Sequence, residues 1–179
     1  MKICFTSYYG LRDALLCAGN ALTQLGCVVC DFHLLEESQK NNDYEKYFVD
    51  FINTEKVSVI LWWYINIPTT KMEYIVNNTH AKHIYFNWDE PYNWPHCDIQ
   101  NKCKFIDHAF VCCTSKMDDY IKFGTKYVHW LPPCHDPKIN NVLVDDNIAI
   151  GYDCDISFIC TNLYTSETDY PEQLFNRKK

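Results

Sequence analysis

Two adjacent carboxylates follow an apolar run near the middle of the chain, in the sequence N-W-D-E-P-Y at residues 87–92. A carboxylate held just beyond the end of a strand can take a proton from a hydroxyl group or hydrogen-bond a sugar hydroxyl. Trp88 and Tyr92 flank the pair with rings of the kind that stack on sugar rings. The same residues also suit a structural role, in which Asp89 caps a turn and the rings pack. The residues alone leave both interpretations open.

Two further stretches place polar or aromatic side chains at predicted strand ends. One is the predicted turn after the first apolar run, Ser7-Tyr8-Tyr9-Gly10. The other is residues 129–137, H-W-L-P-P-C-H-D-P, where two adjacent prolines make a rigid, extended exit from a strand. Because His129 alternates with Leu131 along that strand, the pattern predicts a buried histidine.

The 11 cysteines suggest a redox or zinc protein, but their spacing favours another role. Cys27 and Cys30 lie on a predicted strand, where residues three apart point to opposite faces. Cys112 and Cys113 are neighbours on another strand and diverge as well. We therefore predict reduced, buried thiols and no metal site. One alternative stays open, a cluster in space around His96, Cys97 and Cys103.

An alternation of apolar and amphipathic segments surrounds these stretches. Short apolar runs predict strands at 2–7, 27–34, 57–64, 83–88, 108–113 and 126–131. Helical spacing predicts helices at 11–25, 43–54, 68–78 and 115–123, with a polar loop at 36–42 and a long connection at 89–107. Such alternation is typical of an α/β fold, here a Rossmann-like parallel sheet with helices on both faces. Ligands of these sheets bind at the carboxyl ends of the strands.

The composition excludes several classes of protein. The 179 residues are 47% hydrophobic and 22% charged, which is typical of a globular protein. A formal net charge of -7 argues against a nucleic-acid binder. None of the 5 glycines forms a phosphate-binding motif, which disfavours dinucleotide and flavodoxin-like mononucleotide binders. We find no signal peptide and no apolar run long enough for a transmembrane segment, and therefore predict a cytoplasmic protein.

Four features, taken in order, resemble the spore-maturation-type group of GT-B glycosyltransferases. They are a strand-turn-helix start, W-D-E-P at 88–91, H-W-L-P-P-x-x-D-P at 129–137 and Y-D-x-D-I-S-F-I-x-T-N at 152–162. The resemblance implies two Rossmann-like domains, of which the first receives the acceptor and the second holds the nucleotide sugar. It predicts an acceptor-side domain at residues 1–137, followed at 138–179 by a linker and the truncated start of the second domain. One departure is Cys160, which stands where the family usually has glycine.

The resemblance implies transfer of a sugar from a nucleotide-sugar donor to an acceptor hydroxyl, provided that a donor domain completes the protein. Asp89 is then the predicted catalytic base, with Glu90 as the alternative. The predicted substrate-binding residues are Ser7, Tyr8, Tyr9, Gly10, Trp88, Tyr92, His129, Pro132, Thr161 and Asn162. No cofactor is obligatory, because the family generally stabilises the leaving nucleoside diphosphate without a required metal.

The predicted partner is a carbohydrate or a glycosylated acceptor. The alternative function is a non-catalytic Rossmann-like binding module that pairs with itself, or with a partner chain that supplies the donor domain. Frequent Asn, Ile, Lys and Tyr suggest an AT-rich genome, such as that of a large DNA virus.

Overall fold

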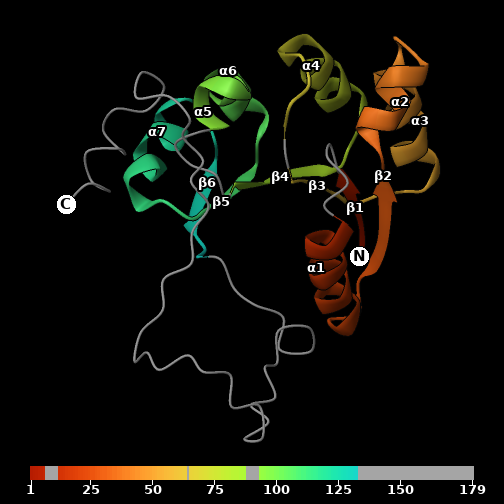
Figure 1. Cartoon of the computed structure of the whole chain (residues 1–179), viewed down its shortest axis with the longest axis horizontal. Coiled ribbons are helices and arrows are strands. Elements are labelled where there is room, and N and C mark those ends of the chain that lie inside the picture. Colours follow the sequence, from red (N-terminus) through yellow and green to blue (C-terminus); the bar gives the residue numbers. More distant parts are fainter. Residues whose placement is uncertain (7–11, 64, 88–92, 133–179) are drawn as a thin grey trace, which may run out of the picture. The chain divides into compact units, whose positions relative to one another are not determined.

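A six-stranded, wholly parallel sheet forms the centre of the protein in a computed structural model, which describes residues 1–6, 12–63, 65–87 and 93–132 (Figure 1). The strands are β1 (Lys2–Thr6), β2 (Val28–Phe32), β3 (Val59–Trp62), β4 (Lys82–Asn87), β5 (His108–Val111) and β6 (Tyr127–Trp130). Each of the six predicted strands is therefore confirmed, with slightly shorter bounds. The predicted second-domain start at 138–179 lies outside the described residues.

The strand order is β2-β1-β3-β4-β5-β6. All neighbouring strands are parallel, as in the register Thr6↔Trp62 between β1 and β3. The order reverses between β1 and β3, because β2 adds on one side of β1 and every later strand adds on the other. It is the flavodoxin-like order of doubly wound sheets, extended by one strand, and it makes β1/β3 the topological switch point. The predicted Rossmann-like α/β class is confirmed.

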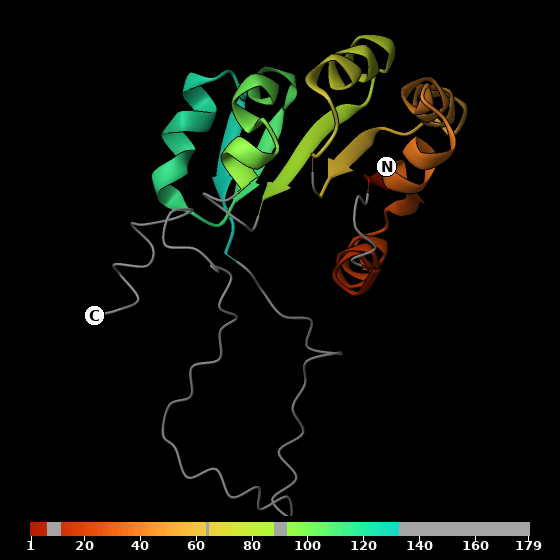
Figure 2. The same cartoon turned by 45° about the horizontal axis from the view of Figure 1, so that its top comes forward.

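Helices cover both faces of the sheet, but unequally. One face carries only α1 (Arg12–Gln24), which lies opposite the other helices (Figures 1 and 2). There Ala18 and Leu22 of α1 pack against Ile3, Phe5 and Val59. The other face carries α2 (Leu34–Lys40), α3 (Tyr44–Thr54), α4 (Thr69–Asn78), α5 (Asn93–His96), α6 (Ile99–Lys102) and α7 (Met117–Lys122).

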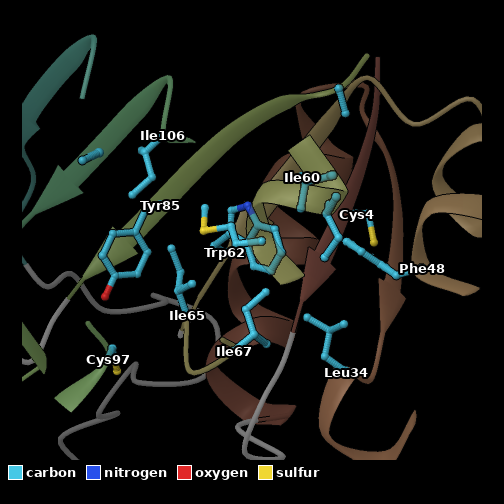
Figure 3. Close-up of a cluster of buried hydrophobic side chains, with 14 of the residues drawn as sticks. Cys4, Leu34, Phe48, Ile60, Trp62, Ile65, Ile67, Tyr85, Cys97 and Ile106 are labelled. Carbon is cyan, nitrogen blue, oxygen red and sulfur yellow. The ribbon is translucent and has the colours of Figure 1, made fainter. Parts of the chain in front are cut away.

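The larger core lies between the sheet and these six helices. Trp62 is fully buried at its centre and contacts the ring of Phe48 edge-on, with centroids 5.9 Å apart (Figure 3). Around it lie the side chains of Ile60 on the same strand, Tyr85 on β4 and Ile106 just before β5. Apolar burial of this kind is worth roughly 1.5–3 kcal/mol for each large side chain, and it dominates the stability of the sheet.

One helix was not predicted. The sequence indicated a polar loop at 36–42, but residues 34–40 form α2. Leu34 is fully buried and fixes the start of the helix, while Glu36 and Glu37 in the first turn and Lys40 in the last turn complement its dipole. Two adjacent leucines followed by polar residues do not produce the apolar spacing by which helices are recognised. The long connection at 89–107 also contains more helix than expected, namely α5, α6 and a 3-10 turn at Cys103–Phe105.

Candidate ligand-binding edge of the sheet

The last residues of the six strands form one edge of the sheet, called here the carboxyl edge. They are Phe32, Thr6, Trp62, Asn87, Val111 and Trp130, in spatial order. Adjacent strands lie about 4.8 Å apart, so the ends of β1 and β4 are separated by roughly 10 Å. The end of β6 is roughly 20 Å from that of β1 by the same spacing.

Most of the predicted site residues lie outside the described residues. These are the proposed base and its alternative, Asp89 and Glu90, and the substrate-binding residues Ser7, Tyr8, Tyr9, Gly10, Trp88, Tyr92, Thr161 and Asn162. The structure does describe the strand ends from which two of these groups leave, Thr6 of β1 and Asn87 of β4. Both strand ends lie on the carboxyl edge, on either side of β3.

The two sides of segment 88–92 are fixed on one residue of α7. Asn87 is buried at the end of β4 and donates a hydrogen bond from Nδ2 to the hydroxyl of Tyr120, at 3.0 Å. Trp94, just after the segment, meets the ring of Tyr120 edge-on, with centroids 4.8 Å apart. The ammonium group of Lys116 lies 5.3 Å from the centroid of the Trp94 ring. A fully buried tyrosine thus holds both ends of the segment that carries the proposed base.

A buried lysine joins the loop that follows β3 to the loop between α5 and α6. Lys102 of α6 is only 2% exposed, and its ammonium donates to the backbone carbonyls of Ile65, at 3.0 Å, and Cys97. Burial lowers the pKa of Lys102. The sequence reasoning missed this residue, because Lys102 stands in a polar stretch with no pattern that marks it as buried.

His129 is a correction to the sequence analysis. It is exposed rather than buried, and lies in the middle of β6 on the face away from α7. Its ring stacks on Phe110 of β5, with centroids 4.8 Å apart. Apolar alternation predicted burial, but β6 is the outermost strand, so its second face lacks the cover that a central strand receives. Pro132 is exposed as well. Both residues lie about four strands from the end of β1.

A polar network lies at the opposite, amino-terminal side of the sheet. The buried His83 accepts a hydrogen bond at Nδ1 from Nε1 of Trp62, at 3.0 Å, and its Nε2 lies 3.4 Å from the hydroxyl of Thr79. Burial lowers the pKa of His83 to about 4, so the ring is neutral near pH 7. Because the neutral ring accepts at Nδ1, it fixes the indole of Trp62 in the core.

Asp107 holds the start of β4 from its position just before β5. Its carboxylate accepts the backbone N–H of His83 at 2.9 Å and an ammonium hydrogen bond from Lys126 at 2.6 Å. Burial raises the pKa of Asp107, but these two hydrogen bonds outweigh burial and keep the pKa below its usual value. His83, Asp107 and Lys126 lie at or just before the starts of β4, β5 and β6, and Trp62 reaches this network from the end of β3. Its role is structural.

Seven cysteines whose side chains the structure describes form no disulfide: Cys4, Cys27, Cys30, Cys97, Cys103, Cys112 and Cys113. Cys97 and Cys103 are buried in the larger core. No group of three or more His, Cys, Asp or Glu side chains in the described ranges is arranged to hold a metal ion, and this includes the proposed cluster around His96. Within the same ranges, no helix has both the length and the apolar character needed to cross a bilayer.

The fold and the carboxyl edge together define the class as a doubly wound, parallel α/β protein with its switch point at β1/β3. No protein-family model matches the chain, and no curated protein matches it either. The carboxyl edge of the sheet and the motifs of the sequence are therefore the features that bear on function.

Proposed function

We propose that residues 1–137 are the acceptor-side domain of a GT-B-like glycosyltransferase. The observation that carries the proposal is the position of two strand ends. Thr6 and Asn87, which precede the predicted substrate-binding and catalytic segments, end β1 and β4 on the carboxyl edge, roughly 10 Å apart. That separation suits a sugar unit, and ligands of doubly wound sheets bind outside this edge at the switch point.

The chemistry assigned to the site is proton transfer from an acceptor hydroxyl. Asp89 takes the proton as the hydroxyl oxygen attacks the sugar carbon of the donor, and the nucleoside diphosphate leaves with the bonding electrons. Trp88 and Tyr92 hold the acceptor ring by stacking. Support for the proposal comes from Asn87 and Trp94, which lie on either side of the segment that carries the base and both contact Tyr120.

The test uses the full chain with a panel of nucleotide sugars and simple oligosaccharide acceptors. We expect a rise in melting temperature with at least one nucleotide sugar or acceptor, and transfer or slow hydrolysis of the matching donor. Asp89→Asn is expected to lower turnover by a factor of 10²–10⁴, as loss of a general base does, while keeping the ligand-dependent melting shift. Glu90→Gln tests the alternative base, and turnover stays within a few-fold if Asp89 is the base.

Two results would contradict the proposal. One is the absence of a melting shift with every nucleotide sugar and acceptor tested. The other is turnover that Asp89→Asn and Glu90→Gln leave equally unchanged.

A binding module that pairs through β6 is the second candidate function. This outermost strand exposes three large apolar side chains: Tyr127 is 58% exposed, Trp130 56% and Leu131 38%. β6 is the outermost strand of the described sheet, and exposed apolar groups on an outer strand commonly mark an interface. Sedimentation at micromolar concentration tests this function. We expect a dimer that Trp130→Lys dissociates, and a strict monomer would exclude self-pairing.

A further inference from the structure

Four rings form a cluster on β5 and β6, on the sheet face away from α7, and this cluster is separate from the carboxyl edge. The register pairs His108 with Tyr127 and Phe110 with His129. Each pair stacks across the two strands, with centroids 4.8 Å apart and planes within 22° and 23° of parallel. The cluster therefore consists of two cross-strand stacks, each of which contains one imidazole.

The two imidazoles meet on the diagonal between the stacks. Nδ1 of His108 lies 3.2 Å from Nε2 of His129. The ring centroids are 5.5 Å apart and the planes differ by 11°. A ring nitrogen lies only about 1.1 Å from its ring centroid, so these two distances are compatible only if both nitrogens lie close to the line between the centroids. The two rings therefore share nearly one plane and meet edge to edge. One nitrogen then carries a hydrogen that the lone pair of the other accepts.

We propose that His108 and His129 bind a divalent first-row transition-metal ion, with Zn²⁺ as the reference ion. Imidazole nitrogens are the preferred protein ligands of Zn²⁺, Cu²⁺ and Ni²⁺. Two nitrogens bound to one tetrahedral zinc at about 2.0–2.1 Å are themselves about 3.3 Å apart. The observed 3.2 Å is already close to that separation. The ion replaces the shared hydrogen, which moves to the outer nitrogen of its own ring.

The surroundings of the pair favour an accessible site with open positions. His129 is exposed and His108 half-buried, so an ion reaches both from solvent. In the edge-to-edge arrangement the two lone pairs point toward each other, so each ring has to turn by roughly 35° to direct its lone pair at an ion on the solvent side. The stacks on Tyr127 and Phe110 limit larger rotations, which reduces the conformational entropy lost on binding. Among the described residues no third His, Cys, Asp or Glu side chain joins the pair, so the other two positions are open to water or an external ligand.

The experiment titrates Zn²⁺ into the reduced full chain by calorimetry, with His108→Gln and His129→Gln as test variants. We expect one site in the natural sequence that weakens at least about tenfold in each variant, because each removes one of two ligands. His80→Gln is the matched control, since His80 is exposed in the turn between α4 and β4. It is expected to leave the affinity unchanged.

Free thiols require a second readout. Co²⁺ bound to thiolate gives a strong near-ultraviolet charge-transfer band, which Co²⁺ bound only to imidazole and water lacks. We expect the site lost in the two variants to lack this band. A zinc affinity that survives in either glutamine variant, or a thiolate band from the site, overturns the proposal. Because the readout is metal binding and the pair includes neither Asp89 nor Glu90, a failure here is distinguishable from a failure of the proposed sugar transfer.

Discussion

The imidazole of His83 shows how one side chain can link stability to pH. It is 2% exposed, and its Nδ1 accepts from the indole of Trp62. A proton at Nδ1 would set two donors against each other, so the folded state requires the neutral ring. This agrees with a pKa lowered to about 4 by burial. The hydrogen bond between Trp62 and His83 therefore persists only at pH values at which the buried ring stays neutral.

We predict that stability falls as the pH drops from about 6.5 to about 4. Above this window His83 is neutral in both states and contributes no pH dependence. Within this window His83 is protonated in the unfolded chain but stays neutral in the folded protein, because the pKa of His83 in the folded state lies below the ordinary value of 6.5. The difference amounts to about 3 kcal/mol at the lower end. Urea unfolding at pH 7, 5.5 and 4.5 measures it.

His83→Asn provides the comparison, because its side-chain oxygen can still accept from Trp62 and does not titrate. The variant is expected to lose most of this slope. Asp107 supplies a separate loss at lower pH, since its lowered pKa makes it stabilising only while ionised. His80→Asn, at an exposed position, should retain the natural slope. Equal slopes in all three proteins would contradict the assignment to His83.

For single residues, the sequence predicted the secondary structure better than the burial and contacts of the side chains. His129 was correctly located on a strand, but its exposure depends on β6 being outermost, and strand order is set by packing across the whole sheet. Its contact with His108 joins residues 21 apart through the β5–β6 register. Lys102 was missed for a similar reason, since its acceptors Ile65 and Cys97 come from different connections.

At the scale of elements, the strands and most helices follow from local patterns. The apolar run at 57–64 predicted β3, and Gly26 and Gly124 marked the ends of α1 and α7. Both glycines adopt positive φ, 81° and 108°, which side chains other than glycine rarely accept. Helix α2 was the exception, because its apolar residues, Leu34 and Leu35, stand together at its start, and the buried Leu34 stabilises the largely polar segment through tertiary contact.

The two glycines give a matched prediction about helix ends. A Cβ at Gly26 would meet nothing within 4 Å, so Gly26→Ala carries only the backbone penalty, about 1–2 kcal/mol. A Cβ at Gly124 would lie 3.2 Å from the Cα and Cβ of Lys104. We therefore expect Gly124→Ala to be the more destabilising substitution, by a further 1 kcal/mol or so. Urea midpoints of the two variants measure the difference, and an equal or reversed order would contradict this account.

At the scale of the whole molecule, the described core is built from the first three-quarters of the chain. The larger cluster extends from Cys4 to Val128 along the sequence, and the smaller one from Ile3 to Ile84. All six strands of the sheet end by Trp130. The residues up to Trp130 thus form both hydrophobic clusters and all six strands of the described sheet, as expected of a domain that folds independently.

We predict that a chain shortened to residues 1–137 still folds. It should unfold in urea as a single cooperative transition, with a midpoint close to that of the full chain. Far-ultraviolet circular dichroism and tryptophan fluorescence should report the same transition, since Trp62 lies in the core. Shortening to residue 124, which removes β6, is the comparison expected to lower the midpoint markedly. Loss of cooperativity in the 1–137 chain would contradict the predicted domain boundary.

The strand order also has a consequence for folding during synthesis. β1, α1 and β2 emerge from the ribosome first, and β3 then pairs with the free side of β1. From that point, each new strand pairs with the strand made just before it, so no strand has to insert between two earlier ones. The sheet can therefore grow in one direction as translation proceeds, at roughly 5–20 residues per second. A pause in translation at any stage leaves a smaller sheet with a single strand edge awaiting the next segment.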